Sequence, residues 1–158
     1  MPTKNLIVFG NPNLPWIRPL INAFNAKKIN TICIELIVTR NRARWGSITI
    51  LQKNDLLWYM PFGFNSYFNY IFTRIIQRRL RRIVEVGTYC FVTDPTLVKN
   101  IPTEVPFIYY MYDDNSNKEI EDQQACRDAS IIVCTSRLLY SRTRNFYPSK
   151  TILYSTHA

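Results

Sequence analysis

The stretch SIIVCTSRLL, residues 130–139, carries the pattern that decides the fold. Its first half is a short apolar run without alternation, and Thr135 and Ser136 follow it directly before a segment with helical spacing. A serine in that place caps a helix, because its hydroxyl accepts a hydrogen bond from a backbone N–H group of the first turn. A continuous apolar strand followed at once by a capped helix is typical of a parallel sheet that is covered by helices.

The same alternation of strands and helical segments continues outward from this stretch. The predicted helices cover about residues 16–28, 65–84, 116–128 and 136–146. The predicted strands cover residues 6–10, 29–38, 47–52 together with 56–60 as one interrupted strand, 89–93, 107–112, 130–134 and 151–154. We therefore predict an α/β fold with a Rossmann-like, doubly wound, mainly parallel sheet of about seven strands and helices on both faces.

The composition predicts one globular domain over residues 1–158. The chain is 47% hydrophobic and 20% charged, which excludes intrinsic disorder. We expect no signal peptide, because the apolar run at residues 6–9 is too short for one. No apolar stretch reaches the roughly 20 residues of a membrane span, so we expect a cytoplasmic protein. The cysteines lack the close spacing of a zinc or redox site. We expect buried thiols in a reducing cytosol and no bound metal at Cys33, Cys90, Cys126 and Cys134.

The positive charge is concentrated in the first half of the sequence. Up to Arg82 there are thirteen Lys and Arg residues against two acidic ones, a net charge of +11, whereas the remainder carries −2. Within the long predicted helix the basic residues lie on one side at helical spacing, and they are Arg74, Arg78, Arg81 and Arg82. Together with the aromatic residues of the first turns, this side fits an anionic membrane surface.

Two other interpretations of this basic side stay open. Arginines on one face of a helix are often only a solvated surface. Basic patches also bind nucleic acid, but no recognition motif accompanies this one, so we expect no specific nucleic-acid partner.

Ligands of open α/β sheets bind beyond the carboxyl ends of the strands, where the strand order reverses. The loop GNPNLP at residues 10–15 lacks the further glycines of a dinucleotide-binding loop, so a nicotinamide or flavin cofactor is not expected. The phosphate loop ending in Gly-Lys-Ser/Thr is also absent. The candidates for substrate binding are residues that follow predicted strands: Gly10, Asn11, Asn13, Asp94, Asp113, Asp114 and Ser136.

Several of these candidates have a structural interpretation beside the functional one. Asp113 and Asp114 could supply a base or hold a substrate hydroxyl. They could also start a turn and stabilise the N-terminus of the next helix, and spacing alone favours this second role. Asp94 precedes Pro95, which favours a turn. An N-cap is the simpler role of Ser136, although a phosphate can bind at such a place.

With these elements in place, the chain resembles the N-terminal domain of a GT-B glycosyltransferase of the family-4, group-1 type. The matching segments follow that domain's order: LIVFG at 6–10 leading to Trp16, WYMP at 58–61 before the long helix, and IYYMYDD at 108–114. DASIIVCTSRL at 128–138 resembles the family's segment of aspartate, alanine, hydrophobic strand, threonine-serine and helix. TILY at 151–154 resembles the strand before the interdomain linker, so the resemblance covers nearly the whole chain.

The resemblance implies the acceptor-binding half of a nucleotide-sugar-dependent hexosyltransferase that acts on a glycan or lipid-linked acceptor of the cell envelope. In this family, two Rossmann-like domains face each other across a cleft, and the C-terminal one binds the nucleotide-sugar through a glutamate-rich motif. The sequence contains no such second domain. We therefore expect this chain to be inactive alone, to hold no cofactor of its own, and to have a donor-binding domain or subunit as partner.

By the same resemblance, Gly10 and Asn11 lie under the donor phosphates or the acceptor. Asp113 stands where the family often has a catalytic or acceptor-orienting histidine. Members that act on envelope acceptors commonly dock on the inner face of the cytoplasmic membrane through a basic, aromatic N-terminal domain, which fits residues 74–82. The alternative function is a non-catalytic α/β module that binds a membrane or a phosphate group.

Overall fold

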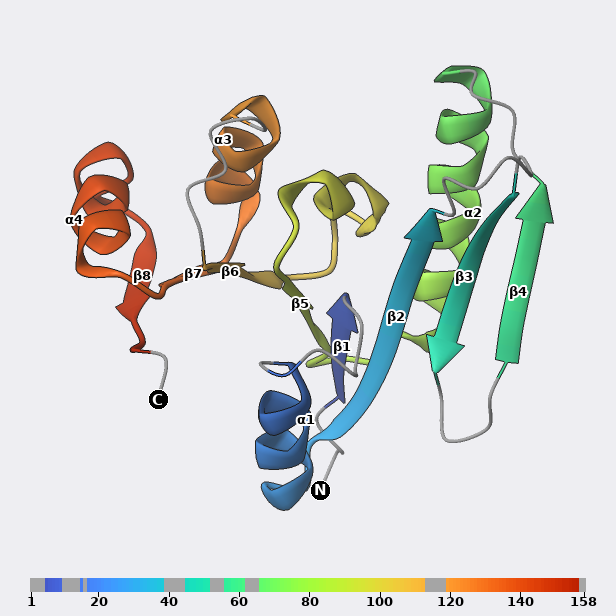
Figure 1. Cartoon of the computed structure of the whole chain (residues 1–158), viewed down its shortest axis with the longest axis horizontal. Helices are drawn as coiled ribbons and strands as arrows, with labels where there is room; N and C mark the ends of the chain where they lie inside the picture. Colours follow the sequence, from blue (N-terminus) through green and yellow to red (C-terminus); the bar gives the residue numbers. More distant parts are fainter. Residues whose placement is uncertain are drawn as a thin grey trace.

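The computed structural model describes residues 5–9, 15, 17–38, 45–51, 56–61, 66–112 and 119–156. These residues form an α/β structure (Figure 1). Its strands are β1 (Asn5–Phe9), β2 (Asn30–Val38), β3 (Trp45–Leu51), β4 (Leu56–Pro61), β5 (Tyr89–Val92), β6 (Phe107–Met111), β7 (Ile131–Cys134) and β8 (Thr151–Tyr154). Its helices are α1 (Ile17–Ala26), α2 (Ser66–Ile83), the 3-10 helix η1 (Pro95–Asn100), α3 (Glu119–Asp128) and α4 (Arg137–Phe146).

All described strands belong to one sheet with the order β4-β3-β2-β1-β5-β6-β7-β8. The six contiguous strands from β2 to β8 are parallel to one another, which confirms the predicted Rossmann-like, doubly wound class. The predicted number of about seven strands is too low by one. The strand predicted as one interrupted strand is two strands, β3 and β4, that pair antiparallel to each other and extend the sheet beyond β2.

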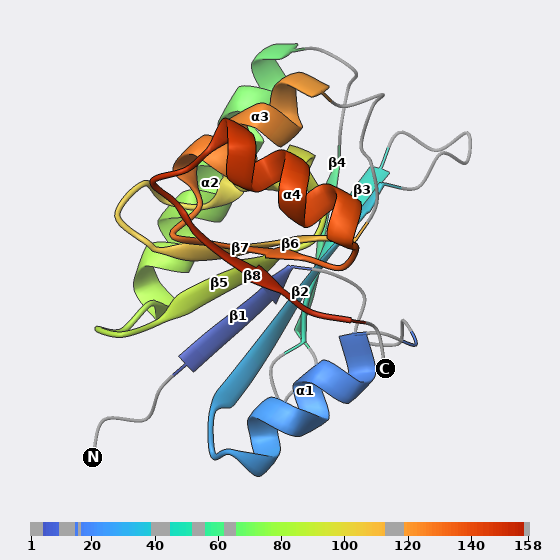
Figure 2. The same cartoon turned by 90° about the vertical axis from the view of Figure 1, so that its left-hand side faces the viewer.

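Helices cover both faces of the sheet, but unequally (Figure 2). The single helix α1 packs on one face, where Ile17 is fully buried against Leu6, Val8, Cys33 and Phe91. The opposite face carries α2, η1, α3 and α4, and the larger core lies beneath them. This division follows from right-handed crossovers, because connections that move in opposite directions along a parallel sheet lie on opposite faces.

Helix α2 carries the chain from β4 back to β5 beside β1. Ile76 and Leu80 are four residues apart on its inner side, and they are 4% and 1% exposed in the larger core. Ile83 is partly buried against the same core at the end of the helix. These three residues form the inner face of α2, and their burial fixes the outward direction of the arginines between them.

No described helix is both long enough and apolar enough to span a membrane.

Candidate functional site

The strand order reverses at β1, which pairs with β2 on one side and β5 on the other. Phe9, the last residue of β1, is aligned with Val92, the last residue of β5, and Val92 is aligned with Tyr109 of β6. The segments that follow these strands therefore leave the sheet at one common edge. In this fold class that edge is the usual place of a ligand. We call it the carboxyl edge.

Five of the predicted binding residues lie outside the described residues. They are Gly10, Asn11 and Asn13, which follow β1 in the sequence, and Asp113 and Asp114, which follow β6. Asp94 and Ser136 are described.

Asp94 is the N-cap of η1 at the carboxyl end of β5. One of its carboxylate oxygens, Oδ1, accepts hydrogen bonds from the backbone N–H of Thr96 at 3.0 Å and from the Thr96 hydroxyl at 2.8 Å. A carboxylate at this position satisfies a backbone donor that the first turn of the helix leaves without a partner. The structural role predicted for Asp94 is confirmed, but the residue caps a 3-10 helix that the sequence analysis did not predict, where only a turn was expected.

Ser136 is the N-cap of α4 at the carboxyl end of β7. Its hydroxyl accepts a hydrogen bond from the backbone N–H of Leu139 at 3.1 Å. The preceding Thr135 joins β7 to β6, because its hydroxyl donates to the carbonyl oxygens of Met111 and Tyr112 at 3.3 and 3.2 Å. The cap predicted from the sequence is confirmed, and the Thr-Ser pair rigidly connects two strand ends to a helix.

The described part of the carboxyl edge offers binding groups rather than a catalytic pair. Tyr112 is 46% exposed directly after β6, and its neighbour in sequence is Asp113. The sequence contains one histidine, His157, which lies outside the described residues. An exposed tyrosine ring that precedes two carboxylates suits the stacking and hydroxyl contacts of a polyhydroxylated ligand. Sequence reasoning missed Tyr112, and its position between an apolar strand and two carboxylates was the available signal.

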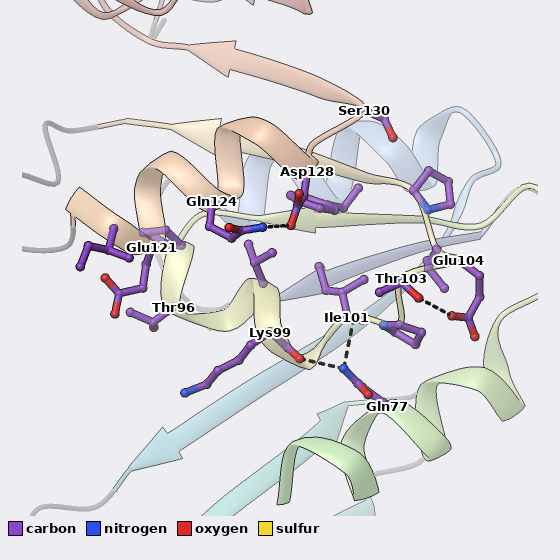
Figure 3. Close-up of a pocket in the computed structure, with 17 residues that line it drawn as sticks. Gln77, Thr96, Lys99, Ile101, Thr103, Glu104, Glu121, Gln124, Asp128 and Ser130 are labelled. Carbon is purple, nitrogen blue, oxygen red and sulfur yellow. Dashed lines mark hydrogen bonds between the residues drawn. The ribbon is translucent and has the colours of Figure 1, made fainter. Parts of the chain in front are cut away.

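A second concave feature lies away from this edge, on the face that carries α2 and α3. It is a groove of about 870 Å³ between these helices (Figure 3). Its floor is the connection from β5 to β6, including Val98, Ile101 and Val105. The sequence analysis did not predict this groove.

The cause of the groove is the proline content of one connection. Pro95, Pro102 and Pro106 all fall between β5 and β6. Proline within a helix removes a backbone donor and clashes with the preceding turn, so an α-helix cannot extend through this connection. A six-residue 3-10 helix forms instead, between an 18-residue and a 10-residue α-helix, and the helical layer is left incomplete there. These prolines were the signal for the groove in the sequence.

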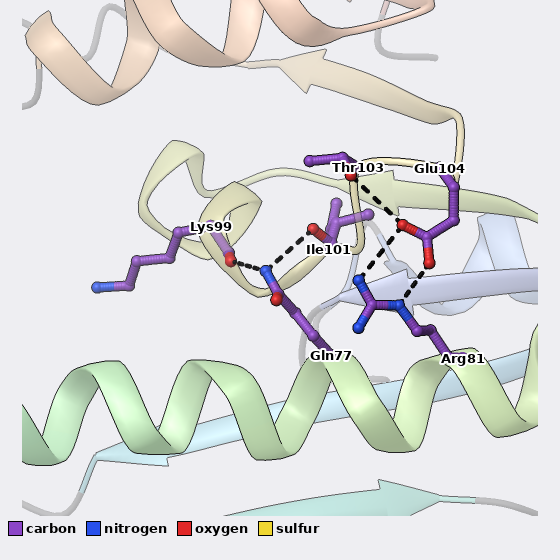
Figure 4. Close-up of polar contacts among 6 residues, drawn as sticks. All are labelled: Gln77, Arg81, Lys99, Ile101, Thr103 and Glu104. Carbon is purple, nitrogen blue, oxygen red and sulfur yellow. Dashed lines mark hydrogen bonds and ion pairs between the residues drawn. The ribbon is translucent and has the colours of Figure 1, made fainter.

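Polar contacts attach the connection to α2 (Figure 4). The Gln77 side chain donates to the carbonyl oxygen of Lys99 at 2.9 Å, and so satisfies an acceptor at the end of η1. Nearer the C-terminal end of α2, Arg81 forms an ion pair with Glu104. The hydrogen bond from Arg81 lowers the pKa of Glu104.

The predicted basic side of α2 is outward-facing, but its arginines differ. Arg74, Arg78 and Arg82 are exposed at four-residue intervals. Arg81 is also exposed, but its charge is balanced by Glu104. Arg74, Arg78 and Arg82, three of the four residues predicted for a membrane surface, form a regular stripe by their spacing, which we call the arginine stripe.

The four cysteines are buried free thiols, as predicted. Burial raises the pKa of Cys33 to about 11 and that of Cys90 and Cys126 to about 12, and it also raises the pKa of Cys134. A nucleophilic or metal-binding cysteine needs a lowered pKa. These thiols therefore serve packing, and among the described residues no group of His, Cys, Asp and Glu side chains is arranged to hold a metal ion.

Comparisons of the chain with protein-family models, curated proteins and solved structures gave no match.

Proposed function

We propose that this chain is the acceptor-binding half of a nucleotide-sugar-dependent GT-B glycosyltransferase that acts on a cell-envelope glycan or glycolipid. The observation that carries the proposal is the reversal of strand order at β1, with β5 and β6 beside it. Gly10 and Asp113, which the family resemblance selects, and the strand-end candidate Asp94 each follow one of these three strands in the sequence, and the three strands end at one edge. In this proposal, that edge receives the acceptor.

The uncovered part of the sheet supports a partner for this half. Ile132 and Cys134 of β7 point into the core under α3 and α4, so Ile131 and Val133 point to the other face. On β8, Leu153 is 51% exposed. The only described helix on that face is α1, which packs beside β2 and not over β7 and β8 (Figure 2). Parallel sheets are normally covered on both faces, and a donor-binding domain or subunit would cover this face of β7 and β8.

The proposal is tested by titrating the isotope-labelled chain with glycan and glycolipid acceptors and recording backbone amide chemical shifts. We expect saturable shifts at the carboxyl edge, at Thr93, Tyr112 and Thr135, because these residues adjoin the loops that would contact the acceptor. Asn5 and Thr88 lie at the opposite end of the strands and serve as internal controls that should not move. Shifts confined to the opposite end, or no saturable shift with any acceptor, would contradict acceptor binding at the carboxyl edge.

A second candidate function, attachment to an anionic membrane surface, is favoured by the arginine stripe on α2. Each basic residue close to such a surface contributes about 1 kcal/mol, and the contribution falls off within a Debye length. Attachment by the stripe is compatible with a lipid-linked acceptor, since both functions need the chain at the membrane.

Reversing two charges of the stripe tests this attachment. In cosedimentation with phosphatidylserine-containing vesicles, we expect Arg78→Glu/Arg82→Glu to lower the partition coefficient by about 100-fold, from about 1 kcal/mol for each lost and each repelled charge with some screening. The matched control is Arg137→Glu/Arg144→Glu, which makes the same charge change on α4 and should retain most of the binding. Equal losses in both variants, or wild-type binding that is insensitive to salt, would exclude the stripe as the attachment site.

A further inference from the structure

An exposed tyrosine lies at the carboxyl edge, close to the reversal of strand order. Tyr112 is 46% exposed and directly follows β6, which is separated from β1 by β5 alone. On β6, Tyr109 and Met111 are buried in the larger core. Ile108 and Tyr110 alternate with them and pack on the side of α1. By this alternation, Tyr112 continues the row of Ile108 and Tyr110, and it is the member of that row that is exposed to solvent.

The backbone at Tyr112 is held in place by β7. The Thr135 hydroxyl donates to the Tyr112 carbonyl oxygen at 3.2 Å, and the backbone N–H of Thr135 donates to the carbonyl oxygen of Met111 at 3.1 Å. The neighbouring ring in the row, that of Tyr110, lies 5.3 Å from the ring of Phe91, centroid to centroid. A group that is held before a ligand arrives loses less conformational entropy when the ligand binds, so Tyr112 is a preorganised contact.

The other exposed aromatic residues in the described part of the chain lie elsewhere. Tyr89 is 39% exposed at the opposite end of β5. Tyr154 ends β8, the outermost strand on that side of the sheet, and its ring lies 6.1 Å from the ring of Tyr140. Phe146 is the last residue of α4. Tyr112 is therefore the exposed ring that lies close to the strand reversal, where ligands of this fold class bind.

We propose that Tyr112 binds the acceptor by stacking against a pyranose ring, so that the acceptor group received at the carboxyl edge is a neutral sugar. This inference rests on the proposed function and specifies the substrate class at its site. A pyranose presents C–H groups on its faces and hydroxyl groups around its rim. An aromatic ring contacts the C–H groups by dispersion and removes their apolar area from water. A phosphate group has no apolar face and would gain nothing from the ring.

The test is the affinity of the chain for methyl glucopyranoside, methyl galactopyranoside and methyl N-acetylglucosaminide, measured from the backbone amide shifts of Thr93 and Thr135. For the glycoside that binds the wild type most tightly, Tyr112→Ala should raise the dissociation constant about tenfold. Tyr112→Phe should stay within about threefold of wild type, because the ring is kept. Tyr112→Leu should lose affinity as the alanine variant does, because leucine is apolar but has no flat ring.

Controls separate stacking from other effects of the substitution. Tyr89→Ala removes a similarly exposed ring at the opposite end of the strands and should bind the glycosides as the wild type does. The melting curves of the Tyr112 variants should match that of the wild type, since an exposed side chain contributes little to the free energy of unfolding.

The outcomes distinguish this inference from the proposed function. Equal affinity of the wild type and Tyr112→Ala would overturn the stacking role and leave acceptor binding at the carboxyl edge intact. Saturable shifts at this edge with uridine diphosphate, and none with a glycoside, would overturn it in favour of a nucleobase. No saturable shift of the wild type with any glycoside, glycan or glycolipid would contradict the proposed function itself, and the sugar contact of Tyr112 with it.

Discussion

Asp113→Asn is expected to lower the turnover of the proposed transferase by about 100-fold or more, the usual contribution of a positioned acid or base. The proposed role of Asp113 is to accept a hydrogen bond or a proton from the acceptor hydroxyl as that hydroxyl attacks the sugar. Asparagine keeps the size of the side chain but loses the negative charge and the basicity. The measurement is the rate of sugar transfer by this chain together with its donor-binding domain or subunit.

Two comparisons make the Asp113→Asn result specific. Asp128→Asn makes the same chemical change at the C-terminal end of α3, far from the carboxyl edge, and should retain wild-type turnover. The melting curve of Asp113→Asn should match that of the wild type, which excludes unfolding as the cause. Wild-type turnover in Asp113→Asn would remove this residue from the mechanism, whereas acceptor binding at the carboxyl edge would still be judged by the chemical-shift experiment.

Leu80→Ala is expected to lower the free energy of unfolding by about 3 kcal/mol, within the range for leucine truncations in a core. Leu80 is 1% exposed and packs with Ile76 in the larger core. Its loss leaves a cavity between α2 and the strands at which the strand order reverses. The measurement is urea unfolding followed by circular dichroism, with the midpoint shifted and the slope unchanged.

Leu138→Ala is the matched control for this substitution. It removes the same atoms from a helix, but Leu138 is 79% exposed, so we expect a change of less than about 0.5 kcal/mol. A similar loss of unfolding free energy in both variants would show that the burial of Leu80 between α2 and the sheet does not stabilise the fold.

The order and type of the α-helices and of most strands could be predicted from the sequence because the signals are local. The apolar run at residues 131–134 and the Ser136 cap are set by neighbours within a few residues, and the structure confirms both. The Asp94 cap depends on Pro95 and Thr96, which are also neighbours in sequence. Such signals act through backbone hydrogen bonds and helical periodicity, which do not require the rest of the fold.

The sheet has eight strands where about seven were predicted, because the sequence does not show which segments pair with each other. Residues 47–52 and 56–60 are apolar enough for either one interrupted strand or two strands. The backbone pairing of β3 with β2 and with β4 shows that they are two strands, which form an antiparallel pair at the edge of a parallel sheet. The groove was missed for a related reason, since a gap in the helical layer exists only relative to the helices on either side of it.

By itself, the sequence determined the α/β class, the cap at Ser136, the buried thiols and the basic side of α2. The tertiary structure decided which of these features meet. Arg81 and Glu104 are 23 positions apart in the sequence, and only the fold brings them together as an ion pair. The tertiary structure also decided that a groove lies between α2 and α3, over the connection from β5 to β6. The physical reason is that local patterns fix the conformation of a segment, whereas long-range packing of the apolar faces fixes which segments become neighbours.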